Sequence, residues 1–168
     1  MKKYLATAAI AVFVLSSCLK QDSKCSYQDS NVVAPEIQIT NLEDSLAKYG
    51  ISGVQTSPSG FMYKIKEQGS GPGVTNLCSV IKVNYKGMFF DGKVFDSTQT
   101  GASAIFELGG VIVGWQKGIP LIKEGGKIDL YIPPSLAYGP KDITENAGNV
   151  VIPGNSYLLF EVEVLSIN

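Results

Sequence analysis

The stretch "VIVGWQKGIPLIKEGGKIDLYIPPSLAYG", residues 111–139, decides the fold of this chain. Its first half has helical character, and the glycines around it limit any helix to about two turns. Its second half changes to an alternating strand, "KIDLYIP", and then to a loop flanked by proline and glycine. The pattern therefore predicts a short helix that lies against a β-sheet.

Alternating segments elsewhere in the chain supply the other strands of this sheet. They are "FMYKIK" (61–66), "SVIKVNYKGMFF" (79–90), "AIFEL" (104–108) and "YLLFEVEVLSI" (157–167). Many strands and one interior helix are typical of an α+β domain. We therefore expect residues 60–168 to form an antiparallel sheet with one helix packed on it.

The first residues have the pattern of an export signal. Lys2 and Lys3 precede an apolar segment over 5–15, which is too short for a bilayer-spanning helix of ~20 residues. We interpret residues 1–17 as a signal peptide. The following "LSSC" resembles the lipobox of bacterial lipoproteins, in which the cysteine, here Cys18, is acylated. An ordinary secretory signal is the alternative.

The lipobox reading predicts a protein that is anchored by lipid to a membrane on its exported side, in the periplasm or at the outer membrane. The polar segment after Cys18 favours a flexible tether over 18–39. Thr40, followed three residues later by Glu43, forms a capping box that predicts a helix start at Thr40. This short helix and a Gly- and Ser-rich joint occupy 40–59.

Two further cysteines leave two alternatives open. Cys25 lies in the polar tether, and Cys78 lies at the edge of a predicted strand. Disulfides persist in an export compartment, so the two could pair. Alternatively, Cys78 is a small buried hydrophobic residue and Cys25 stays unpaired.

Composition excludes several classes of chemistry. The chain contains no histidine, and all 14 of its basic residues are lysines. Nucleophiles activated by histidine and zinc sites built on histidine are therefore excluded. The absence of arginine excludes a bidentate phosphate clamp. A net charge of −1 gives no electrostatic footprint for nucleic acid.

Three phrases together make the chain recognisable. They are the opening stretch, "VNYKGMFFDGKVFDST" (83–98) and "IPGNSYLLFEVEVLSI" (152–167). From about Gly60 to its end the sequence closely resembles an FKBP-type peptidyl-prolyl cis-trans isomerase. The resemblance implies a curved antiparallel sheet wrapped round a short helix, with a pocket for proline-containing polypeptides between them and no cofactor. The helix before the domain looks like the N-terminal extension of bacterial cell-envelope members.

The resemblance also assigns roles to individual residues. It makes Trp115 the platform for the proline ring, and it makes the Tyr138 hydroxyl and the Ile112 main-chain N–H hydrogen-bond donors to the substrate. An unpaired buried charge costs several kcal/mol, so Asp96 either faces water or belongs to the site. The resemblance implies a carboxylate at the pocket edge, held by the Tyr85 hydroxyl or the Ser97–Thr98 region. The expected catalytic residues are Tyr85, Phe95, Asp96, Trp115, Tyr138 and Phe160, and the expected substrate-binding residues are Val111, Ile112 and Ile152.

The sequence departs from the family in three places. Ala104 stands where an aromatic wall residue is common, and the arginine that often partners the aspartate is absent. The loop over 139–151 is longer than usual and lacks the histidine that some members have. These departures bear on substrate preference and on affinity for macrolide-type inhibitors. A non-catalytic binding module or chaperone for apolar segments is the alternative function, and a structural lipoprotein is a weaker one.

Overall fold

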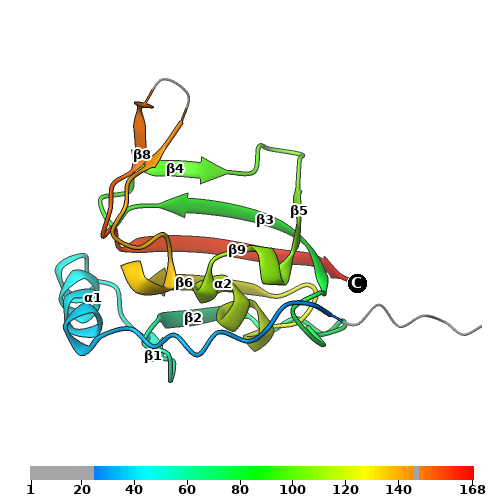
Figure 1. Cartoon of the computed structure of the whole chain (residues 1–168). Helices are drawn as coiled ribbons and strands as arrows, with labels where there is room; N and C mark the ends of the chain where they lie inside the picture. Colours follow the sequence, from blue (N-terminus) through cyan, green and yellow to red (C-terminus); the bar gives the residue numbers. More distant parts are fainter. Residues whose placement is uncertain (1–24, 146–147) are drawn as a thin grey trace, which may run out of the picture.

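The computed structural model describes residues 25–145 and 148–168, which form an antiparallel sheet with helices packed on it (Figure 1). The main sheet has seven strands in the order β1-β2-β6-β9-β3-β4, and β5 also pairs with β3. The α+β class expected from the sequence is confirmed. The main-sheet strands are β1 (Gln55–Thr56), β2 (Met62–Glu67), β3 (Val80–Met88), β4 (Val94–Ser97), β5 (Ala104–Glu107), β6 (Lys127–Ile132) and β9 (Leu158–Ile167).

The short interior helix, α2 (Val113–Gly118), lies against one face of this sheet. It is preceded by the 3-10 turn η1 (Leu108–Gly110) and followed by η2 (Ile119–Leu121). Two glycines of α2 allow a close approach to β6, because a Cβ on Gly114 would meet Ile132 and one on Gly118 would meet Leu130. The glycines that predicted a short helix therefore also set the distance between this helix and the sheet.

Strand alternation separates the two faces of the sheet. Leu130 and Ile132 of β6 belong to the main core beneath α2. Tyr131, between them, points to the other face, where it joins a second cluster with Leu42 and Leu46 of the N-terminal helix α1 (Glu36–Lys48). The two α-helices therefore cover opposite faces of the sheet.

Helix α1 differs from its prediction at its start. It begins at Glu36, Pro35 stands at the N-cap position, and no side chain caps the helix. The predicted capping box at Thr40 is wrong, because Thr40 lies inside the helix. Proline suits the start of a helix, since its missing N–H would be unpaired there in any case. The C-terminal end of the predicted tether, 36–39, is thus helical.

The segment before α1, which we call the N-terminal strap (residues 25–35), is fixed at both ends. A disulfide joins Cys25 to Cys78, with 5.6 Å between the two Cα atoms. At the other end Ala34 is buried, and its N–H donates to the Ser59 carbonyl over 2.9 Å. The strap, blue in Figure 1, runs across the molecule to α1. This part of the predicted flexible tether is therefore ordered, and the paired alternative for the cysteines is the one observed.

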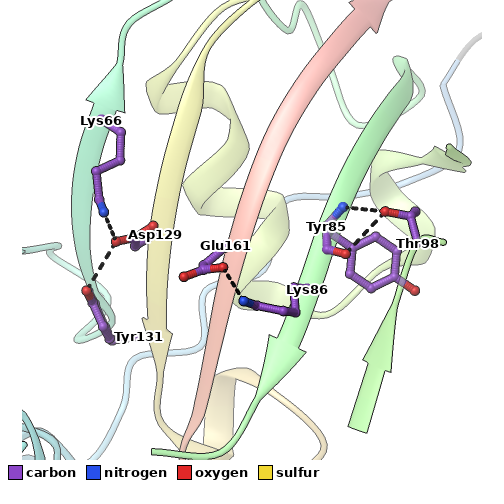
Figure 2. Close-up of polar contacts among 7 residues, drawn as sticks. All are labelled: Lys66, Tyr85, Lys86, Thr98, Asp129, Tyr131 and Glu161. Carbon is purple, nitrogen blue, oxygen red and sulfur yellow. Dashed lines mark hydrogen bonds and ion pairs between the residues drawn. The ribbon is translucent and has the colours of Figure 1, made fainter. Parts of the chain in front are cut away.

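The face of the sheet opposite α2 also carries a row of ion pairs beyond α1 (Figure 2). Lys66 lies 2.8 Å from Asp129, which also accepts a 3.4 Å hydrogen bond from Tyr131. Lys86 pairs with Glu161 over 2.9 Å. Lys86 and Glu161 are both about half exposed, so their pair contributes little to stability, about 0–1 kcal/mol. Asp129 is buried, so its charge depends on its two partners, Lys66 and Tyr131. These ion pairs make this part of the face polar. The apolar site described next lies on the other face, beside α2.

Two features complete the fold. The predicted long loop contains a hairpin of β7 (Ile143–Thr144) and β8 (Val150–Ile152), which projects beyond β4 (Figure 1). The predicted signal peptide and Cys18 lie outside the described residues. Within the described ranges, no helix is long and apolar enough to cross a membrane.

Candidate active site

A cavity of about 260 Å³ opens between α2, η1 and the inner face of the sheet. Most of its lining is aromatic or aliphatic, and a single carboxylate stands at its edge. The lining residues are Tyr85, Asp96, Phe106, Gly110, Val111, Ile112, Trp115, Tyr138 and Phe160. The structure thus brings together seven of the nine residues that the sequence singled out for the pocket.

Trp115 forms the floor of this cavity, and its side chain is almost fully buried. Three rings meet the indole edge-on: Tyr85 and Phe160 with centroids at 5.4 Å, and Phe106 at 6.0 Å. Such edge-to-face pairs are favourable because the positive edge of one ring meets the negative face of another. The indole Nε1 is buried without a hydrogen-bond partner among the described residues. The floor is therefore closely packed on three sides by aromatic rings, and one polar N–H lies within it.

The start of α2 sets the wall next to this floor. The Ile112 carbonyl accepts hydrogen bonds from the N–H groups of Trp115 at 2.9 Å and Gln116 at 3.1 Å. The Gln116 side chain donates to the carbonyls of Gly109 at 3.1 Å and Val111 at 2.8 Å. The Ile112 N–H lies ahead of the helix and has no intrahelical partner. One helix turn therefore fixes the floor, the wall and a main-chain donor together.

Asp96 is held by the tyrosine that the sequence suggested as its partner. The Tyr85 hydroxyl donates to the Asp96 carboxylate over 2.5 Å. Thr98 instead fixes the main chain of Tyr85, accepting from its N–H at 3.0 Å and donating to its carbonyl at 3.3 Å (Figure 2). The pKa of Tyr85 lies far above that of an ordinary phenol. The largest cause is burial, and the hydrogen bond to Asp96 and the negative charge of Asp96 add to it.

Tyr138 stands at the mouth of the cavity, on the loop after η3 (Pro134–Leu136). Its side chain is 41% exposed. Partial burial and the charge of Asp96 raise the pKa of Tyr138, so its hydroxyl keeps its proton at neutral pH. It can therefore donate a hydrogen bond to a ligand that enters the cavity.

Two expected pocket residues, Phe95 and Ile152, lie outside this lining. They line a neighbouring cavity of about 260 Å³ beside the β7–β8 hairpin, which shares Asp96 and Tyr138 with the first. The Phe95 ring packs edge-on against Phe160 at 5.6 Å, so it supports the wall from behind. Gly87 makes room for this packing, because an added Cβ there would meet both rings.

Two lining residues, Phe106 and Gly110, were not predicted from the sequence. A signal for Phe106 existed in the alternation of "AIFEL". Residues two apart on a strand share a face, so Phe106 lies on the same face as Ala104, while Ile105 is exposed. An aromatic ring, Phe106, therefore does stand on this wall, two positions after Ala104. No local pattern marks Gly110.

Comparison with known proteins gives a consistent result. The sequence model of a family described as FKBP-type peptidyl-prolyl cis-trans isomerase matches residues 74–165. The FKBP-type isomerase FkpA of Escherichia coli K12 is 47% identical over 116 residues, which are 68% of this chain and 40% of FkpA. A probable FKBP-type isomerase of Haemophilus influenzae is 44% identical over 116 residues, 68% of this chain and 46% of that protein. The chain thus matches less than half the length of these two relatives.

Two solved structures have a similar fold. The crystal structure of Escherichia coli FkpA aligns with a TM-score of 0.62 and 40% identity, covering 79% of this chain and 63% of that one. The crystal structure of AtFKBP13 aligns with a TM-score of 0.62 and 37% identity, covering 70% of this chain and all of the other.

Proposed function

The chain belongs to the family of FKBP-type peptidyl-prolyl cis-trans isomerases, and we propose that it accelerates rotation about Xaa-Pro bonds in exported polypeptides. One observation carries this proposal: the single tryptophan of the chain forms the buried floor of an apolar cavity and is braced by three aromatic rings. A proline ring is apolar and compact, so it suits such a floor.

The physics of the reaction favours this kind of cavity. Amide resonance holds the peptide bond planar, and uncatalysed rotation takes tens to hundreds of seconds. In the twisted transition state the resonance is lost, so the carbonyl is less polar than in the planar ground state. A dry apolar cavity binds the less polar state better, and only such differential binding accelerates a reaction. The reaction needs no nucleophile, metal or general base.

The polar groups of the cavity would position the substrate. We assign the Tyr138 hydroxyl and the Ile112 N–H as donors to substrate carbonyls. The 2.5 Å hydrogen bond from Tyr85 would keep the Asp96 carboxylate oriented at the cavity edge. Phe95 and Ile152 would act from the adjoining cavity, where a chain that continues past Asp96 and Tyr138 would meet them.

The proposal extends to location and inhibitors. An acylated Cys18 would attach the domain to a membrane on the exported side of the bacterial envelope, so its substrates would be exported proteins rich in proline turns. Macrolide-type inhibitors would enter the same cavity. Phe106 would supply the aromatic contact on the wall where the sequence has Ala104.

A protease-free isomerisation assay on a short Xaa-Pro peptide tests the activity. We expect Phe160→Leu to lower kcat/KM by about tenfold, the equivalent of ~1.4 kcal/mol of transition-state binding. Phe61→Leu is the matched control, because Phe61 is as deeply buried as Phe160 but lies outside the cavity lining. This control should lose stability and keep its activity.

The same preparation separates catalysis from simple binding. A protein that suppresses the aggregation of unfolded clients and leaves the isomerisation rate unchanged would be a non-catalytic binding module. That result would contradict the proposal.

A further inference from the structure

The N-terminal strap makes an unusually close contact with the wall of the cavity. The ring of Tyr27 lies directly on the main chain of Gly109, where a Cβ would overlap three ring carbons. The Tyr27 hydroxyl donates to the Glu107 carboxylate over 3.1 Å. Any side chain at position 109 would displace the ring, so the contact requires glycine.

This contact lies one residue away from the cavity lining. Gly110 and Val111 line the cavity, and the carbonyl of Gly109 accepts a hydrogen bond from the side chain of Gln116. Gln116 follows Trp115 on α2. A shift of Gly109 would therefore reach both the wall, through the chain, and the floor, through Gln116.

The disulfide holds the strap against this wall. Cys25 lies two residues before Tyr27. Its partner Cys78 lies between Leu77 and Ser79, whose carbonyls accept hydrogen bonds from η1. The Leu77 carbonyl accepts from Gly109 N–H at 2.6 Å, and the Ser79 carbonyl accepts from Leu108 N–H at 3.0 Å. The disulfide thus joins the strap to the segment that already fixes η1.

We propose that Tyr27 is a positioning residue for the cavity, acting through Gly109 and Gly110, and that the Cys25–Cys78 disulfide holds it in place. Tyr27 is 37% exposed, and ordering each residue of a chain segment costs conformational entropy. One partly exposed ring does not offset that cost along the strap. The disulfide lowers this cost, because it keeps the ring near Gly109 in every state that retains the disulfide. The kinetic part of this inference rests on the proposed isomerase function.

Substitution of Tyr27 tests the contact with the disulfide intact. We expect Tyr27→Ala to lower kcat/KM by about threefold to tenfold, because a misplaced wall weakens substrate positioning. Tyr27→Phe keeps the ring on Gly109 and should stay within about twofold of the wild type. Tyr49→Ala, at a similarly exposed tyrosine after α1, is the matched control and should leave kcat/KM unchanged.

Fluorescence gives a readout that does not depend on activity. Trp115 is the only tryptophan of the chain, so its emission and acrylamide quenching report on the cavity floor. We expect increased quenching in Tyr27→Ala and a wild-type signal in Tyr27→Phe and Tyr49→Ala. If the wild type shows no isomerase activity, the proposed function fails while this readout still decides the role of Tyr27. Wild-type quenching in Tyr27→Ala would overturn the inference.

A double-mutant cycle tests the role of the disulfide. The double variant Cys25→Ser/Cys78→Ser should show the increased quenching of Tyr27→Ala, and adding Tyr27→Ala to it should change quenching and kcat/KM by less than about twofold. Fully additive effects would show that the disulfide and the ring act independently, which overturns this part of the inference. Treatment of the wild type with dithiothreitol should reproduce the effect of the double variant.

Discussion

Replacement of Gly114 by alanine sets two opposing effects against each other. In a helix, alanine is favoured over glycine by up to about 1 kcal/mol, so propensity alone predicts a more stable protein. However, the new Cβ would lie 2.6, 2.7 and 2.9 Å from three side-chain atoms of Ile132. Ile132 is fully buried on β6, between β2 and β9, so it has little room to move aside. Overpacking of this kind costs about 1–3 kcal/mol.

The helix propensity offsets about 1 kcal/mol of this cost, so we expect Gly114→Ala to lower the free energy of unfolding by about 0–2 kcal/mol. Urea denaturation followed by Trp115 fluorescence measures this change. In an Ile132→Ala background, which removes all three contacting atoms, the same substitution should become neutral or stabilising. A stabilised Gly114→Ala protein, or a cost that persists unchanged in the Ile132→Ala background, would refute the argument that α2 is packed tightly against β6.

Four further outcomes are expected. Loss of the Cys25–Cys78 disulfide, which spans a sequence separation of 53 residues, should lower the free energy of unfolding by about 4 kcal/mol in urea titrations; a loss below ~1 kcal/mol would contradict the chain-entropy estimate. Because burial and the nearby carboxylate raise the pKa values of Tyr85 and Tyr138, these phenols lose their protons only above the ordinary value of ~10, and kcat/KM should stay flat from about pH 7 to 9.5. A fall with a midpoint below about pH 9 would show that another group titrates in the reaction. Peptides with Leu before proline should react faster than those with Glu, since the apolar cavity would desolvate the charge; equal kcat/KM values would argue against substrate contact with this lining. Cys18→Ser should move the protein from membrane to soluble fractions or leave its signal unprocessed, and unchanged membrane partitioning of a processed variant would exclude acylation at this residue.

The longer strands were predictable because alternation is a local signal with a period of two residues, whereas β1, β4, β7 and β8, with two to four residues each, are too short to show it. The segment over 157–167, for example, forms β9, in which burial alternates from Leu158 to Val164 before the register shifts at Leu165. The start of α1 was not found, because the capping-box pattern at Thr40 is also compatible with a helix interior. Pro35 was the better signal, since proline is common at the first positions of helices.

The site was predictable where it depends on short phrases and not where it depends on distant contacts. Trp115 and Tyr138 stand in distinctive local sequences, and the structure places both at the cavity. The disulfide and the contact of Tyr27 with Glu107 join residues 53 and 80 positions apart. Local sequence patterns do not predict contacts between residues so far apart in the chain, because these contacts depend on how the whole sheet folds.

If Cys18 carries a lipid, the disulfide also limits how far the domain can stand from the membrane. Cys25 follows Cys18 by seven positions, and an extended chain of seven steps spans at most about 25 Å. Without the disulfide the next fixed point would be Ala34, and the same calculation allows about 55 Å. The tether of the oxidised protein then reaches at most about 25 Å, and reduction roughly doubles the greatest height above the membrane that one anchored molecule can reach. The disulfide would then determine which parts of an exported chain come within reach while they emerge from the membrane.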